Sequence, residues 1–168
     1  MLRKFVLVSA MLAFCSLGLA QVAVQPVADP GPLREAEGLP AGLSWDRVAY
    51  RMQLEQPQTV TVEWWLNGRR LDEESKAFKP GPLTVATGYG RAEGQGCSLY
   101  WSVTLEGGVG EAQKAFCLEI APLAPEAPVF QGALPGTLEP GTTYLLAWFH
   151  YADALSRTSD LAVTLRLE

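Results

Sequence analysis

Apolar and polar residues alternate with a period of two along most of the chain beyond residue 44, which is typical of β-strands with one buried face. The clearest examples are 48–54, 60–66 and 97–105. No segment shows the period of an amphipathic helix, and no repeat of fixed length is visible. Gly and Pro turns separate some eight or nine such segments, so we expect an all-β, antiparallel β-sandwich. The expected strands are 48–54, 59–66, 69–71, 83–87, 97–105, 109–120, 129–134, 142–151 and 161–167.

A two-residue turn sets the expected pairing of the second strand with the third. Asn67-Gly68 supplies the two positions of positive φ that a type I′ hairpin requires. In that register Trp64 lies opposite Leu71, and we expect both side chains to point inward.

Residues 1–20 have the composition of a secretory signal peptide. Arg3 and Lys4 form a basic start, 5–17 is apolar, and small residues precede a cleavage site after Ala20. The apolar run is short for a membrane anchor and no basic cluster follows it. We expect cleavage, with a retained anchor as the alternative. The expected protein is exported, to the periplasm or outside the cell, with no membrane span after cleavage.

The two cysteines beyond the signal segment form a candidate disulfide. A three-residue turn at 106–108 would place Leu105 opposite Val109 and, further along the strands, Cys97 opposite Cys117. In an exported chain these two cysteines have one possible intramolecular pairing, so we predict a Cys97–Cys117 bond, with two free buried thiols as the alternative. Such a bond would stabilise the fold by about 3 kcal/mol in the chain-entropy model.

The rest of the chain divides into a short preface and one domain. Residues 21–43 are rich in Pro and show no strand pattern, so we expect an extended arm or linker. Residues 44–168 form the expected sandwich domain. Too few residues follow the Pro-rich stretch 121–128 to build a second core, so we expect it to cross between strands of one domain. We expect a flexible loop at 88–96.

Composition and charge exclude several classes of protein. The 168-residue chain is 48% hydrophobic and 18% charged, and its formal net charge is −5. Signal cleavage would remove two basic residues and no acid, which takes the charge to −7. A chain of this composition folds rather than staying disordered. Its negative charge repels nucleic acid and anionic lipid, so we expect no nucleic-acid partner.

In the C-terminal part of the chain the segment Leu138–Tyr144 is followed by an apolar strand, a polar turn and 161–165. This arrangement resembles the end of a fibronectin type III domain. The resemblance implies that Tyr144 forms a tyrosine corner, with its hydroxyl bonded to the backbone a few residues upstream and Leu138 as its core partner. The hairpin 64–71 is similar to the Trp-containing C strand and turn of immunoglobulin-like domains. Such sandwiches have many unrelated functions, so the likeness implies architecture alone.

The segment 142–151 is apolar on both faces, which is unusual for a strand with one wet face. We expect Trp148 and His150 to point inward. In an immunoglobulin-like sandwich this strand would neighbour the one before Asn67, so the outward side chains would form one candidate binding face: Trp65, Leu145, Phe149 and Tyr151. Exposed aromatic patches mark interaction sites. The alternative is that residues 21–45 or the disulfide hairpin cover this face.

Little in the sequence points to catalysis. The single histidine, His150, shares its expected side with Trp148, and no second His or free Cys remains for a catalytic triad or a transition-metal site. Glu63 has no assignable second carboxylate for glycoside hydrolysis. The acidic run 72–74 is typical of a solvated turn rather than a calcium site. We expect no enzyme activity, no catalytic residue, no metal and no cofactor.

These expectations describe a non-catalytic exported module that binds protein partners or has a structural role at the cell envelope. The expected partner is an envelope protein or a second copy of the chain, bound mainly through a few aromatic anchors. The alternative is a carbohydrate-binding module that stacks a glycan on the same surface aromatics.

Overall fold

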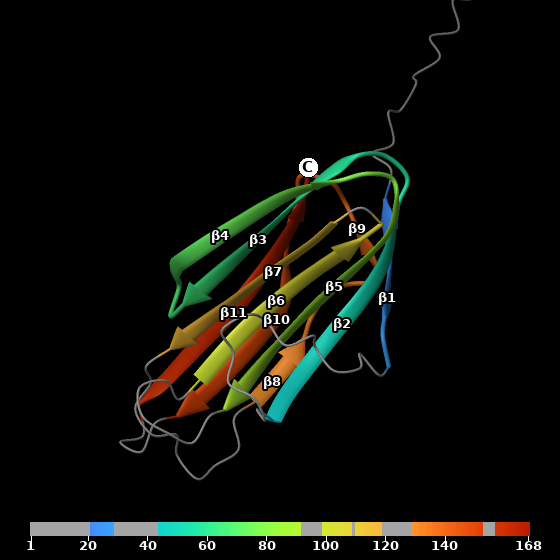
Figure 1. The fold of residues 1–168 in the computed structure, drawn as a ribbon. Helices are drawn as coiled ribbons and strands as arrows, with labels where there is room; N and C mark the ends of the chain where they lie inside the picture. Colours follow the sequence, from blue (N-terminus) through green and yellow to red (C-terminus); the bar gives the residue numbers. More distant parts are fainter. Residues whose placement is uncertain (1–20, 29–43, 92–98, 109, 119–128, 153–156) are drawn as a thin grey trace, which may run out of the picture.

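The computed structural model describes residues 21–28, 44–91, 99–108, 110–118, 129–152 and 157–168. These residues form eleven β-strands and no helix (Figure 1). The strands are β1 Val22–Pro26, β2 Ser44–Leu54, β3 Gln58–Leu66, β4 Arg69–Phe78, β5 Gly81–Arg91, β6 Leu99–Gly107, β7 Gly110–Leu118, β8 Val129–Gly132, β9 Thr137–Leu138, β10 Thr143–Ala152 and β11 Thr158–Leu167.

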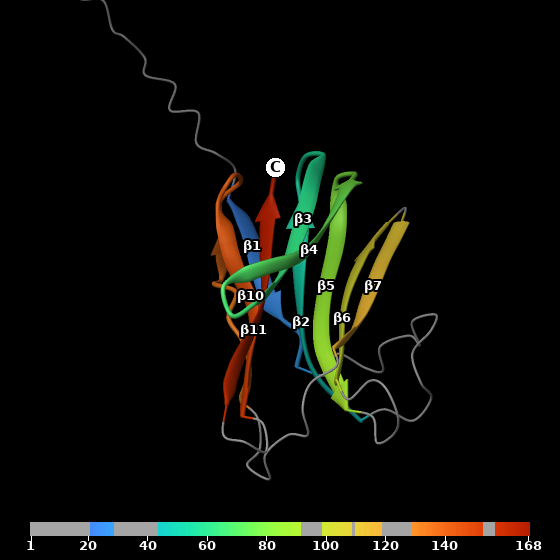
Figure 2. The same ribbon diagram turned by 90° about the vertical axis from the view of Figure 1, so that its left-hand side faces the viewer.

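The strands form two sheets. One has six strands in the order β7-β6-β5-β2-β1-β9, and the other has five in the order β4-β3-β11-β10-β8. Every pair of neighbouring strands is antiparallel. Figure 2 shows β10 and β11 in one layer and β5, β6 and β7 in the other. The predicted all-β antiparallel sandwich is confirmed, with more strands than the sequence pattern indicated.

Aromatic rings from both sheets meet in the core. Tyr89 and Trp101 from the six-stranded sheet contact Phe130 and Phe149 from the five-stranded sheet, with ring centroids between 4.3 and 6.1 Å apart. The indole Nε1–H of Trp101 donates a hydrogen bond to the Thr87 hydroxyl at 3.1 Å. This bond satisfies the one polar atom of a fully buried tryptophan, so the cluster carries no desolvation penalty there.

Strand β8 approaches the other sheet because Gly132 has no side chain. A Cβ at this position would collide with the Tyr50 hydroxyl and with Val48 on β2. Burial raises the pKa of Tyr50, and a backbone hydrogen bond with Leu134 opposes part of that rise. The Tyr50 side chain therefore lies against β8, the edge strand of the five-stranded sheet.

A β-bulge in β10 decides which of its side chains reach the core. Leu145 pairs with Thr164 and Ala147 pairs with Val163, so Leu146 is an extra residue on β10. Leu146 and Ala147 are both fully buried although they are consecutive. The inside–outside alternation is therefore inverted beyond the bulge.

Because of this inversion, half of the predicted binding face is wrong. Phe149 is 0% exposed and Tyr151 is 6% exposed, and both lie in the core instead of on the outer face. Trp148 and His150, expected inside, lie on the outer side and are partly exposed.

The β3–β4 hairpin has the predicted turn and a second bulge. Asn67 and Gly68 have φ of 50° and 77°, which confirms the type I′ turn. Trp65 pairs with Arg70 and Trp64 pairs with Asp72, which leaves Leu71 as the extra residue. The prediction that Leu71 lies inward opposite Trp64 is wrong, since Leu71 is 42% exposed. Trp64 itself is buried, as expected.

The β6–β7 hairpin has a tighter turn than predicted. Gly107 pairs with Gly110, and this register places Cys117 opposite Tyr100. The prediction that Cys97 lies opposite Cys117 in this hairpin is therefore wrong in its register. Cys97 lies outside the described residues, so the predicted disulfide stays a prediction.

Two segments expected to lack strands belong to the sheets. Residues 22–26 of the Pro-rich preface form β1, which pairs with β2 on one side and with β9 on the other. Val22 and Val24 enter the core, so this part of the expected arm is a strand of the sandwich. Its two-residue alternation is short and ends at Pro26, which hid it among the neighbouring prolines.

The first part of the loop expected at 88–96 is also strand, because β5 continues through Arg91. A Cβ at Gly88 would lie 2.6 Å from the backbone carbonyl oxygen of Asp46 and from Arg47 Cγ. Gly88 therefore allows β2 to approach β5 closely, and it does not mark a flexible loop.

Strand β11 lies between β3 and β10. The expectation that β10 is the direct neighbour of the Trp65 strand is therefore wrong, although both strands belong to one sheet. The segment before β10 carries the geometry that the resemblance implied. The backbone N–H of Glu139 donates to the Tyr144 hydroxyl at 2.9 Å, and Leu138 is fully buried.

Replacing Phe149 tests the bulge. Phe149→Ala removes a ring with no exposed surface, so we expect the free energy of unfolding to fall by about 3–5 kcal/mol. Leu145→Ala is the control, because Leu145 is 40% exposed on the other side of the bulge; we expect a change within about 0.5 kcal/mol. Urea unfolding followed by tryptophan fluorescence measures both. Equal losses in the two variants would contradict the assignment.

The hydroxyl of Tyr144 can be removed while its ring stays in place. Tyr144→Phe loses only the bond from the Glu139 N–H. We expect the free energy of unfolding to fall by about 0.5–1.5 kcal/mol, the usual net contribution of one hydrogen bond. Amide hydrogen exchange at Glu139 should accelerate at the same time. An unchanged exchange rate at that amide would show that the corner does not form in solution.

Candidate functional site

Two tryptophans share a row across the outside of the five-stranded sheet. Trp65 on β3 pairs with Ala162 on β11, and Ala162 pairs in turn with Trp148 on β10. Directly paired residues point to the same side of a sheet. The two indoles therefore flank a single methyl group, with their Cα atoms roughly 10 Å apart, which is two strand spacings.

A row of polar side chains that ends in an aliphatic residue lies on each side of these tryptophans. On one side Leu145, Thr164 and Glu63 form a row, and on the other Val129, His150 and Asp160 do. We call this surface the outer aromatic face. It consists of Glu63, Trp65, Trp148, His150, Asp160, Ala162 and Thr164.

Asp160 holds one end of the outer aromatic face. One carboxylate oxygen, Oδ1, accepts a hydrogen bond from Trp148 Nε1 at 3.0 Å and lies 2.8 Å from His150 Nδ1. The rings of Trp148 and His150 are tilted by 32°, with centroids 5.5 Å apart. One carboxylate therefore orients two neighbouring aromatic rings.

The hairpin turn positions Asp160 in its turn. Asn67 donates its backbone N–H to the Asp160 carbonyl at 2.8 Å and accepts a bond from the Asp160 backbone N–H through Oδ1 at 2.8 Å. Its side-chain amide also donates to the Ser159 hydroxyl at 3.3 Å. Asn67 is the single asparagine of the chain. It serves both the type I′ turn and the start of β11.

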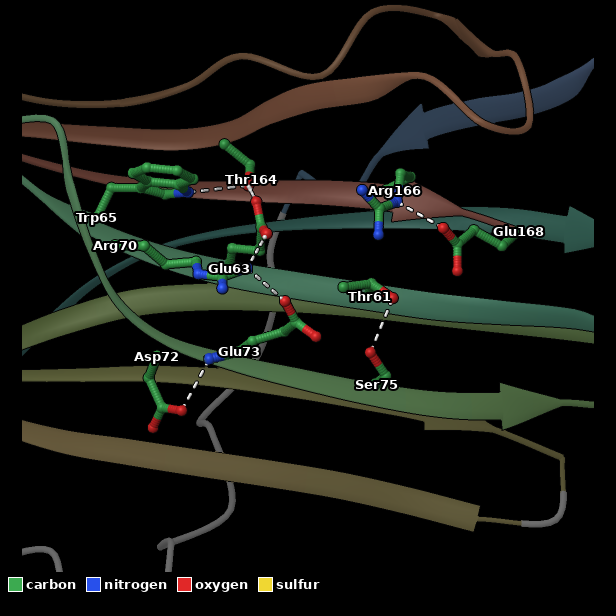
Figure 3. Close-up of polar contacts among 10 residues, drawn as sticks. All are labelled: Thr61, Glu63, Trp65, Arg70, Asp72, Glu73, Ser75, Thr164, Arg166 and Glu168. Atoms are coloured by element: carbon green, nitrogen blue, oxygen red, sulfur yellow. Dashed lines mark hydrogen bonds and ion pairs between the residues drawn. The ribbon is translucent and has the colours of Figure 1, made fainter.

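A second polar network holds Trp65, as Figure 3 shows. The indole Nε1–H of Trp65 donates to the Thr164 hydroxyl at 3.4 Å, and that hydroxyl donates to Glu63 Oε2 at 3.2 Å. The other oxygen of Glu63 binds Arg70 Nη1 at 3.0 Å, and the same nitrogen lies 2.7 Å from Glu73. The chain of contacts runs from an aromatic ring through a hydroxyl to an ion-pair network.

Acids and bases are paired over this side of the sheet. Glu63 and Glu73 share Arg70, Asp160 faces His150, and Arg166 lies 2.8 Å from Glu168. Four carboxylates thus contact two guanidinium groups and one imidazole, so acidic groups are in excess on this surface, as they are in the chain as a whole.

The outer side of the six-stranded sheet differs. Its outward positions at the centre carry small side chains, and Ala49, Ala86 and Ser102 there are buried. Among the described residues the row of two partly exposed tryptophans therefore belongs to the five-stranded sheet.

The predicted binding residues separate into two pairs. Trp65 and Leu145 lie on the outer side of the five-stranded sheet, whereas Phe149 and Tyr151 lie in the core. Sequence reasoning missed Trp148 as a surface residue. The signal that could have found it is polar His150 between two aromatic residues, because a polar residue marks the solvent side of a strand.

The candidates for chemistry take structural contacts. Glu63 and Glu73 both bind the same guanidinium nitrogen, and His150 contacts Asp160 and Trp148. In the described parts of the chain no three His, Cys, Asp or Glu side chains gather as metal ligands. The same parts contain no helix that is long and apolar enough to cross a membrane.

Removing the Asp160 carboxylate tests its role in orienting Trp148. In Asp160→Ala we expect the indole N–H resonance of Trp148 to shift, while that of Trp65 stays in place, because the two rings have separate acceptors. Thr164→Val is the matched control and should move the Trp65 resonance alone. Trp148→Phe and Trp65→Phe assign the two signals in ¹H–¹⁵N spectra. Shifts of both indoles in both variants would contradict two independent networks.

Comparison with known proteins finds no family to which the chain can be assigned. The chain matches no protein-family model, no curated protein and no solved structure. The arrangement of the outer aromatic face is therefore the basis for assigning a function.

Proposed function

We propose that this chain is a non-catalytic module that binds a partner at the cell envelope through its outer aromatic face. One observation carries the proposal: Trp65 and Trp148 lie partly exposed on either side of Ala162 on the outer sheet face, and each indole N–H is anchored. Anchored rings lose little conformational entropy on binding, which is why aromatic residues dominate binding surfaces.

The proposed compartment rests on the sequence. Residues 1–20 have the basic start, apolar middle and small-residue end of a secretory signal. An oxidising compartment would also permit the proposed Cys97–Cys117 disulfide. Export to the periplasm or the cell exterior places the module where envelope components are its available partners.

An immunoglobulin-like or fibronectin type III-like kinship is part of the proposal. The Glu139 N–H to Tyr144 hydroxyl bond and the two-sheet architecture support it. The order β3-β11-β10 differs from the neighbour relation expected for that family, so the kinship rests on the corner and the layers.

The non-catalytic part of the proposal rests on how the charged groups are used. Glycoside hydrolysis needs two carboxylates with different roles, but Glu63 and Glu73 are tied together through Arg70 across a hairpin. His150 is held by Asp160 at the surface and has no nucleophile among the contacts described.

A protein partner or a second copy of the chain is one candidate occupant of this face. Leu145 and Val129 are 40% and 49% exposed, and both pair into the rows that border the tryptophans. A protein surface could bury these two aliphatic side chains together with the indoles.

Sedimentation with isolated envelopes of the producing cell tests the proposed function. We expect the secreted protein to bind, and Trp65→Ala/Trp148→Ala to reduce bound protein by at least about tenfold, since aromatic anchors carry most of the binding energy. Leu71→Ala is the matched control, because Leu71 is exposed on β4 outside the tryptophan row. Thermal unfolding within a few degrees of wild type shows that each variant folds. Equal binding by the double variant and wild type would refute the proposal.

A further inference from the structure

We infer that the occupant of the outer aromatic face is an uncharged saccharide chain that lies across β3, β11 and β10. This inference rests on the proposed function and specifies its ligand. It follows from three properties of the face: the separation of the indoles, the pairing of its charges, and the placement of its polar groups.

The indole separation fits a ligand made of repeated rings. Trp65 and Trp148 lie two strands apart, and Ala162 between them rises no further than a methyl group. A saccharide presents apolar C–H faces that pack on aromatic rings, and successive sugars repeat along the chain. Two rings with a low gap between them can therefore contact two sugars of one chain while the part of the chain between those sugars crosses the alanine.

The pairing of charges favours a neutral ligand. Glu63 and Glu73 share one guanidinium, that of Arg70, and His150 contacts Asp160, so carboxylates are in excess beside the tryptophans. An anionic chain would be repelled by this excess, and a cationic chain would have to displace Arg70 from its two carboxylates, which is costly when a charge is left uncompensated. An uncharged hydroxylated ligand has no such cost.

Polar side chains lie beside the two indole rings, where the hydroxyl groups of a stacked sugar would extend. The side chains of Asp160 and His150 are 52% and 36% exposed beside Trp148. Glu63 and Thr164 lie next to Trp65. Carboxylates accept strong hydrogen bonds from hydroxyl groups. A few fixed polar groups around apolar contacts are the common composition of small-ligand sites.

The same placement argues against a protein partner. Protein interfaces have an apolar centre and a polar rim. Here the apolar centre is a single row, Trp65, Ala162 and Trp148, with polar side chains in the rows directly beside it. One row of apolar side chains between polar rows suits a narrow ligand better than a broad protein surface.

Calorimetry with defined hexasaccharides tests the inference on the secreted, full-length protein. The neutral panel is cellohexaose, xylohexaose, mannohexaose and the hexamer of N-acetylglucosamine; the charged comparators are the glucosamine hexamer and hexagalacturonate. We expect at least one neutral chain to bind, and both charged chains to bind at least about tenfold more weakly. Trp65→Ala and Trp148→Ala should each weaken binding by about tenfold or more, as loss of one stacked ring does.

A variant that leaves both tryptophans in place guards against misfolding as the cause. Ala162→Gln fills the gap between the indoles from a partly exposed position, and we expect it to weaken binding of the neutral chain by at least about tenfold. Leu71→Ala should bind as wild type does. Unaltered binding in Ala162→Gln would overturn the proposed path of the chain.

Envelope binding separates failure of this inference from failure of the proposed function. If envelope binding needs both tryptophans but is abolished by protease treatment of the envelopes, and no neutral hexasaccharide binds, the partner is a protein and the saccharide inference is overturned. If protease leaves envelope binding intact and a neutral hexasaccharide competes for it, the inference is supported. Envelope binding that ignores both tryptophans overturns the proposed function and this inference together.

Discussion

One inserted residue in β10 determines what this protein shows to its surroundings. Without the bulge at Leu146, strict alternation from Tyr144 would turn Trp148 and His150 inward and expose Phe149. With it, residues on both sides of the bulge reach the core, because two consecutive positions, Leu146 and Ala147, face inward. The bulge thus lets the tyrosine corner and the aromatic cluster pack against one core. The same inversion places an indole and an imidazole on the outer surface.

The fold and the candidate site depend on the same contacts. Asn67 forms the β3–β4 turn, and its bonds to the Asp160 backbone dock that turn against β11. Asp160 then uses its side chain to hold Trp148 and His150. A change in the turn would therefore reach the aromatic rings through one residue, with no rearrangement of the core. Sites positioned by strands and short turns retain their geometry better than sites on long loops.

Residue alternation predicted the strands and the sandwich because burial of one strand face leaves a period of two in any sequence. The Asn67 turn was predictable because few residues adopt positive φ. The bulges could not be predicted in the same way. Leu146 lies between apolar neighbours, so the residues that point inward are apolar whether or not the strand contains an extra residue. The β6–β7 register was ambiguous for another reason: Gly107, Gly108 and Gly110 permit turns of two or three residues. Two of the four predicted face residues lie on the expected side: Leu145 precedes the bulge in β10, and Trp65 is on another strand.

The edge of the five-stranded sheet helps to explain why a ligand would use its face. Strand β4 is a long edge strand, and unpaired edges invite addition of a strand from another chain. However, Asp72, Glu74 and Lys76 pair with Trp64, Val62 and Val60, so these charged side chains point to the side that faces the other sheet. Inward charges on an edge strand oppose strand addition, since a new neighbour would bury them further. On the outer side, by contrast, the charges are already paired beside anchored rings. A ligand that covers this side leaves both the edge and the core unchanged.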